Sequence, residues 1–174
     1  GLRNGVFQVF SSDHAPFHYT GAAGKFHAGE TPAFVHVPNG VPGIETRLAL
    51  LFSEGLMTGR IDINTFVAIT STNVAKIYGL YPRKGTIAVG ADADIVIWND
   101  REELIIDNAM LHHNVDYTPY QGMNIRAWPE MTLSRGDVVW DRGIASGVPG
   151  RGQFLRCERV NLARNGTYVE SGMD

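Results

Sequence analysis

The sequence predicts an α/β fold, with helices in its first half and β-strands in its second. An apolar run at residues 6–10 is typical of a strand, and apolar residues recur at helical spacing from residue 43. From Gly85 onward, short apolar runs alternate with turn residues, which predicts strands and hairpins. The chain has 174 residues, of which 44% are hydrophobic, so we expect one domain or part of one.

A strand and a long loop are expected to open the chain. Residues 6–10 predict a buried strand that ends in the polar residues 11–14. The segment 15–42 is rich in Gly and Pro and is longer than most connections in compact domains. We therefore expect this loop to be functional.

Short helices are expected to follow the loop. The first begins near Gly43, and Gly55 stands where a C-terminal cap belongs. Asp62 or Asn64 can cap the next helix, and a further helix is expected to end at residues 78–79. The first helix is indicated by apolar residues at helical spacing: Ile44, Leu48, Leu51 and Phe52.

The second half is expected to be built from strands. Residues 95–98 predict one buried strand and residues 104–106 another. Residues 131–140 predict a hairpin that turns at Arg135-Gly136, and Arg142-Gly143 marks a second turn.

Composition excludes several kinds of partner. The net charge is -3 and no basic run is present, which argues against nucleic acid. No apolar stretch approaches the roughly 18 residues of a membrane span. The single cysteine, Cys157, allows no internal disulfide, so we expect a reducing, cytoplasmic setting and a plain, partly buried thiol. Because the chain begins at Gly1 without an initiator Met, we also expect a piece of something longer.

Asp13 and His14 are the sharpest local signal for chemistry. They follow the apolar run, and side chains at the carboxyl ends of parallel strands converge where α/β barrels place catalysis. From residue type alone, the more frequent alternative is that Asp13 caps the next turn and His14 binds a backbone carbonyl group. Both interpretations stay open at this point.

The histidines do not form a recognisable metal motif. Neither His-Glu-x-x-His nor His-x-His occurs, so the chain is not expected to carry a complete metal site. His112 and His113 are adjacent and are expected to point to opposite faces of a strand. The loop histidines are expected to be exposed; they are His18, His27 and His36.

Asn39 and Gly40 predict a tight turn that leads into the first helix. Main-chain N–H and C=O groups in such a turn can bind a small polar ligand. A turn and cap without any ligand is equally compatible with these residues.

Several motifs together resemble the C-terminal part of the cyclic amidohydrolases, most closely their D-hydantoinase and dihydropyrimidinase branch. The motifs are SSDHAPF at residues 11–17, PNGVPGIETR at 38–47, NVAKIYGLYPRKGTIAVGADAD at 73–94, YQG at 120–122 and TLSRGDVV at 132–139. The similarity extends over nearly the whole chain.

The resemblance implies a fold and a chemistry. The fold would be the last strand and helices of a (β/α)8 TIM-type barrel plus the C-terminal strands of a β-sandwich subdomain. Residues 1–84 would belong to the barrel, 85–145 to the sandwich, and 146–174 to an extended tail that reaches a neighbouring subunit. The enzyme would be a tetramer with two divalent metal ions, by expectation zinc, and would open small cyclic amides such as hydantoins and dihydropyrimidines.

The resemblance also assigns roles to two residues. Asp13 matches the aspartate that follows the eighth barrel strand, binds one metal ion and transfers the proton between the attacking water and the leaving nitrogen. The main chain of Asn39 matches the position that binds the cyclic amide. The family's remaining metal ligands and its oxyanion-stabilising tyrosine precede the eighth strand and are absent here. A non-catalytic scaffold relative, an allantoinase or a dihydroorotase are the alternatives.

Overall fold

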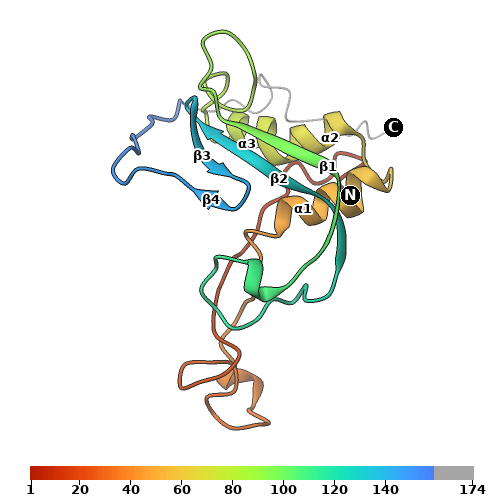
Figure 1. Ribbon diagram of the computed structural model, residues 1–174, viewed down its shortest axis with the longest axis vertical. Coiled ribbons are helices and arrows are strands. Elements are labelled where there is room, and N and C mark those ends of the chain that lie inside the picture. The colour runs from red at the N-terminus through yellow and green to blue at the C-terminus, as the bar shows by residue number, and fades with distance from the viewer. Residues whose placement is uncertain (159–174) are drawn as a thin grey trace, which may run out of the picture.

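The computed structural model describes residues 1–158, which form a mixed α/β structure. Its helices lie along one side of an antiparallel sheet, and residues 15–42 extend away from both as a long loop (Figure 1). That loop contains one short 3-10 helix, Phe34–His36. Within the described residues, no helix has the length and apolar character needed to cross a membrane.

The first helical segment is longer than the sequence predicts. Helix α1 (Arg47–Leu51) continues directly into a π-helical segment, Phe52–Met57. Gly55 lies inside this segment, so the prediction that it caps the helix is wrong. A Cβ atom at Gly55 would lie 3.2 Å from the side chains of Ile61 and Leu51, so close packing favours glycine there. The helix ends at Thr58, where Gly59 adopts a φ of 71° that glycine tolerates.

The second helical segment begins as predicted. Asp62 is the N-cap of α2 (Ile63–Val67), and the Thr65 N–H donates to its carboxylate at 2.7 Å. The segment continues through π-helical residues Ala68–Thr72 into α3 (Asn73–Ile77). Gly79, at a φ of 65°, follows its end, which confirms the predicted stop.

The sheet has four strands in the order β1-β2-β3-β4. The two strands predicted at 95–98 and 104–106 form a single strand, β1 (Ile95–Ile105), which pairs with β2 (Asn124–Ser134). Register shifts after Ile97 and after Asn99 accommodate the polar residues between the two apolar runs. Val96 and Ile97 are 38% and 46% exposed, so the prediction of a buried strand is wrong, because β1 lies at the edge of the described sheet.

Both predicted turns are confirmed. Arg135 and Gly136 join β2 to β3 (Asp137–Asp141) with φ values of 50° and 84°. Arg142 and Gly143 join β3 to β4 (Ile144–Ala145) with φ values of 45° and 90°. Two consecutive residues at positive φ are typical of the tight hairpin turn that matches the twist of the strands.

The core lies between the helices and the β1–β2 pair. The Phe52 ring stacks on Trp98 of β1 at a centroid distance of 4.6 Å, and Phe66 lies 5.4 Å from Phe52. A second cluster joins Ala49 of α1 to Ile106 and Ile125. These contacts fix the helical half of the chain onto the sheet.

Three further expectations need correction or stay untested. Residues 6–10 do not form a strand: Val6 and Phe7 are 72% and 61% exposed. No strand among residues 1–158 pairs with them, and the segment is held instead by hydrogen bonds from the Phe10 N–H to Ile69 and from Asn73 to Gln8. Cys157 is exposed, because the chain near it packs on little else. The predicted tail, 146–174, lies partly outside the described residues.

Candidate active site

The structure places the segments of Asp13 and Asn39 side by side. His14 and Val41 form a parallel β-bridge, and the Ala15 N–H donates to the Val41 carbonyl at 3.2 Å. Asp13 and Asn39 directly precede these paired stretches, and both are exposed. Two residues 26 positions apart in the numbering of the chain therefore face solvent from adjacent segments.

His14 fixes the orientation of this segment. Its Nδ1 atom accepts hydrogen bonds from the N–H groups of Gly43 and Ile44, at 3.1 and 3.3 Å. The alternative in which His14 binds a backbone carbonyl is therefore wrong, because Nδ1 acts as an acceptor. Successive side chains of an extended segment point to opposite faces, so Asp13 points away from these contacts.

The Asp13 carboxylate accepts no hydrogen bond from any residue within 1–158 and forms no ion pair there. It does not cap a turn in this part of the chain. An exposed carboxylate oxygen of this kind is available to a hard divalent cation or to a proton.

The turn at Asn39 is held by Lys25. Its Nζ atom donates to the carbonyls of Pro38 and Gly40, at 2.8 and 2.7 Å. The main-chain N–H and C=O of Asn39, between them, make no hydrogen bond to another residue of the described chain. The turn therefore presents one complete peptide edge to solvent.

Gly40 allows the two segments to approach. It adopts a φ of 94°, and a Cβ atom there would overlap the Ala15 side chain. Any other residue would face both backbone strain and a steric clash. This position explains why the turn contains a glycine.

The far end of the long loop is anchored by Asp116. Its carboxylate accepts hydrogen bonds from the Tyr19 and Thr20 N–H groups and from the Thr20 hydroxyl, at 2.6, 3.0 and 2.5 Å. The Thr20 hydroxyl and the Tyr19 N–H hold the pKa of Asp116 well below its usual range. The Tyr19 ring also packs against Tyr117 at 5.3 Å, so the segment between β1 and β2 supports the loop (Figure 1).

The residues present fit one part of a metal site. Within residues 1–158 no three His, Cys, Asp or Glu side chains gather closely enough to hold a metal ion. Asp13 offers one oxygen ligand of the type that zinc and manganese accept. A complete centre would need ligands from outside the described residues.

The paired histidines are used elsewhere. His112 and His113 lie in a loop after the 3-10 helix Asn108–Met110, so the prediction that they belong to a strand is wrong. His112 pairs with Glu45 at 2.9 Å, and His113 bonds to Asn108 at 2.8 Å. Burial lowers the pKa of His113. Local contacts of this kind interrupt the extended backbone that a strand requires.

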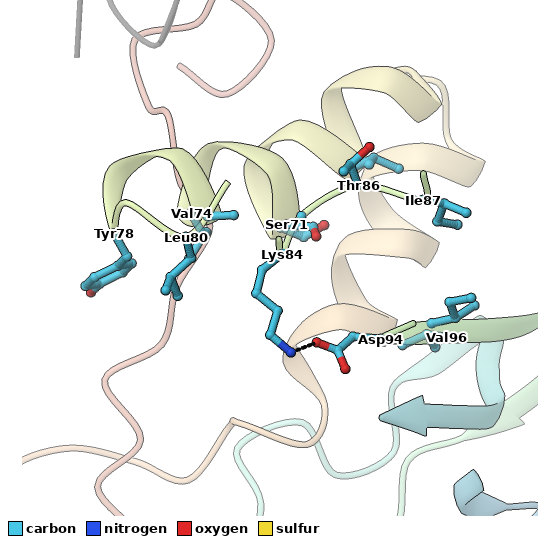
Figure 2. A pocket seen from close by; sticks show the side chains of 14 residues that line it. Ser71, Val74, Tyr78, Leu80, Lys84, Thr86, Ile87, Asp94 and Val96 are labelled. Atoms are coloured by element: carbon cyan, nitrogen blue, oxygen red, sulfur yellow. Dashed lines mark hydrogen bonds and ion pairs between the residues drawn. The ribbon is translucent and has the colours of Figure 1, made fainter. Parts of the chain in front are cut away.

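A pocket lies between α3 and the start of β1, on another part of the molecule. Figure 2 shows Lys84 reaching down to Asp94, with Leu80 and Val96 on either side. The cavity measures about 370 Å³ and is lined by neither Asp13 nor Asn39. Hydrogen bonds and charge from Lys84 oppose the burial of Asp94 and lower its pKa. This pocket is separate from the predicted site.

The sequence interpretation missed Lys25 and Asp116. Lys25 precedes the carbonyls that it binds by 13 and 15 residues, and Asp116 lies 96 residues after Thr20. No local pattern links residues at such separations, so only the folded backbone reveals them.

Comparison with known proteins agrees with this geometry. Residues 1–139 match the amidohydrolase family. The chain is 41% identical over 155 residues to a D-hydantoinase of Ralstonia pickettii, covering 89% of this chain and 33% of that protein. It is 45% identical over 156 residues to a D-hydantoinase of Geobacillus stearothermophilus, covering 89% and 32%.

A solved structure shows the same fold. The dihydropyrimidinase of Brevibacillus agri superposes with a TM-score of 0.85 at 42% identity, covering 92% of this chain and 34% of that one. The chain spans about a third of the length of the relatives that it matches. Because the family match extends over most of the sequence, the chain belongs to the amidohydrolase family.

Proposed function

We propose that the chain is the C-terminal part of a metal-dependent cyclic amidohydrolase that opens hydantoins and dihydropyrimidines by hydrolysis. The observation that carries this proposal is the pairing of segments 13–15 and 39–41, which places an exposed carboxylate beside an exposed peptide edge. Identity of 41% and 45% to D-hydantoinases supports the substrate class.

The Asn39 turn is the proposed binding element. A cyclic amide presents adjacent N–H and C=O groups, which are complementary to the C=O and N–H of one peptide edge. The Asn39 main chain offers both groups, and no residue within 1–158 occupies them. Main-chain recognition of this kind fixes the ring while leaving its substituent unread.

Asp13 is the proposed proton carrier and one metal ligand. Bound divalent ions, by proposal two zinc ions, would lower the pKa of a water molecule and polarise the ring carbonyl. The Asp13 carboxylate would take the proton from that water as it attacks and deliver it to the leaving ring nitrogen. No described residue competes for that carboxylate, which leaves it accessible for both roles.

The proposed architecture follows the same relatives. Residues 1–84 would supply the last strand and helices of a (β/α)8 barrel, 85–145 part of a β-sandwich, and 146–174 an extended tail. The extended, unpaired segment 6–10 is consistent with a barrel strand whose neighbours come from outside the described residues. We place the enzyme in the cytoplasm as a homotetramer.

The test is a substrate comparison with the full-length enzyme that contains these residues. Purified enzyme loaded with zinc would be assayed on a 5-substituted hydantoin, dihydrouracil, dihydroorotate and allantoin. The proposal predicts the highest kcat/KM on the hydantoin or dihydrouracil. Faster opening of dihydroorotate or allantoin would contradict the substrate assignment, and no ring opening at all would favour a non-catalytic scaffold.

A further inference from the structure

Lys25 holds the turn that contains Asn39 from both sides. Its Nζ atom donates to Pro38 and Gly40, the residues immediately before and after Asn39. Its own main-chain N–H donates to the His18 carbonyl at 2.9 Å. The side chain therefore starts from a fixed point in the loop and ends on the turn.

These contacts are of a strong kind. Lys25 is half-buried, and no carboxylate among residues 1–158 forms an ion pair with it. Its charge is therefore satisfied by carbonyl oxygens, and hydrogen bonds from a charged donor are shorter and stronger than neutral ones. A flexible side chain held in this way gives up rotamer freedom, which the two bonds must offset.

The result is a preorganised peptide. The Pro38 and Gly40 carbonyls converge on one nitrogen atom, so the two peptide units that flank Asn39 are fixed in orientation. Gly40 permits this conformation at a φ of 94°. The main chain of Asn39 needs no reordering before it binds a ligand, and such preorganisation strengthens binding.

We propose that Lys25 is a positioning residue for substrate binding, which acts by fixing the Asn39 peptide against the ring of the cyclic amide. This inference rests on the proposed function of the Asn39 turn. The side chain of Asn39 cannot report on its own main chain, so Lys25 offers the direct genetic test of main-chain recognition.

The test is steady-state kinetics on dihydrouracil with the full-length, zinc-loaded enzyme. Lys25→Met keeps the length of the side chain and removes its donors, while Lys25→Arg keeps a charged donor. Lys76→Met is the matched control, because Lys76 lies on α3 and contacts the Tyr81 ring. We expect Lys25→Met to raise KM by about 10-fold with kcat little changed, because only ground-state positioning is lost.

The other variants separate positioning from stability. Lys25→Arg should recover part of the lost affinity, and Lys76→Met should leave KM unchanged. An unchanged KM in Lys25→Met, with an active wild type, would overturn this inference alone. Equal losses in kcat, KM and the unfolding midpoint would also overturn it by showing a purely structural role. An inactive wild type would instead overturn the proposed function.

Discussion

Thr20 and Asp116 lie 96 residues apart in the sequence and share two hydrogen bonds in the structure. The Thr20 N–H and hydroxyl both donate to Oδ2 of Asp116, at 3.0 and 2.5 Å. The Tyr19 N–H donates to the other carboxylate oxygen at 2.6 Å. One carboxylate between β1 and β2 thus anchors the start of the loop from which Lys25 reaches the Asn39 turn.

Removing the charge at residue 116 should loosen this loop. Asp116→Asn leaves one oxygen acceptor and places an NH2 group against the donors of Tyr19 or Thr20. We expect amide hydrogen exchange at these two residues to become about 10-fold faster, while the global unfolding midpoint changes little. Mass-spectrometric exchange on the full-length protein measures this.

The control for this variant is Asp100→Asn. Asp100 is exposed and forms no ion pair within the described residues. It should leave exchange at Tyr19 and Thr20 unchanged. Equal exchange in wild type and Asp116→Asn would show that the carboxylate does not anchor the loop.

The same anchor should depend on pH. The hydrogen bonds from Thr20 and Tyr19 lower the pKa of Asp116 below the unfolded value of about 3.9, so its contribution is present above that value and is lost as pH falls. His18, whose Nδ1 lies 3.5 Å from the carboxylate, adds attraction when it is protonated, and the Tyr117 hydroxyl is neutral throughout this range.

Exchange protection factors test the pH dependence. Protection of the Tyr19 and Thr20 amides should stay high down to about pH 4 and decrease below it. Asp116→Asn should show no such decrease. Protection that increases on acidification would contradict the assignment of Asp116 as the titrating group.

Gly40 offers a steric test of the paired segments. Gly40→Ala would place a methyl group on the Ala15 side chain and impose a φ of 94° on an alanine. We expect a decrease of about 10-fold or more in kcat/KM on dihydrouracil, because the strain displaces the Asn39 turn. Steady-state kinetics of the full-length enzyme measures it.

Gly21→Ala is the matched control for Gly40→Ala. Gly21 lies in the same loop at a φ of 88°, and no atom lies within 4 Å of a Cβ atom placed there. It carries the same backbone strain without the clash, so kcat/KM should stay close to wild type. Equal losses in the two variants would assign the effect to backbone strain alone.

Phe66 tests the packing of the helices on the sheet. Phe66 is 6% exposed and lies 6.0 Å from Trp98 and 5.4 Å from Phe52. Phe66→Ala should lower the free energy of unfolding by about 3–5 kcal/mol. Phe34 is 86% exposed, so Phe34→Ala should change it by less than about 0.5 kcal/mol. Urea unfolding followed by tryptophan fluorescence distinguishes them, and similar midpoints would contradict this core.

Features that depend on neighbouring residues were predictable from the sequence. The turns at Arg135-Gly136 and Arg142-Gly143 and the Asp62 cap are set within a few residues, and the structure confirms all three. The helix end was misplaced from Gly59 to Gly55, because both are glycines after an apolar run. Only packing against Ile61 distinguishes them.

Features that depend on distant residues were not predictable. A strand requires a partner, so the apolar run at 6–10 gave the wrong prediction where no described strand pairs with it. For the site, Asp13 and Asn39 were identified through motifs that resemble the cyclic amidohydrolases, and the structure brings their segments together. Lys25 and Asp116 act through contacts that only the folded chain creates.

The central claim is that Asp13 carries the proton during ring opening. The most direct measurement is kcat of the full-length, zinc-loaded Asp13→Asn variant on dihydrouracil, with Asp100→Asn as its control. Asparagine keeps the shape of the side chain but cannot carry the proton, so kcat should decrease by about 1,000-fold with the unfolding midpoint close to that of wild type. Turnover within a few-fold of wild type would contradict the role assigned to Asp13.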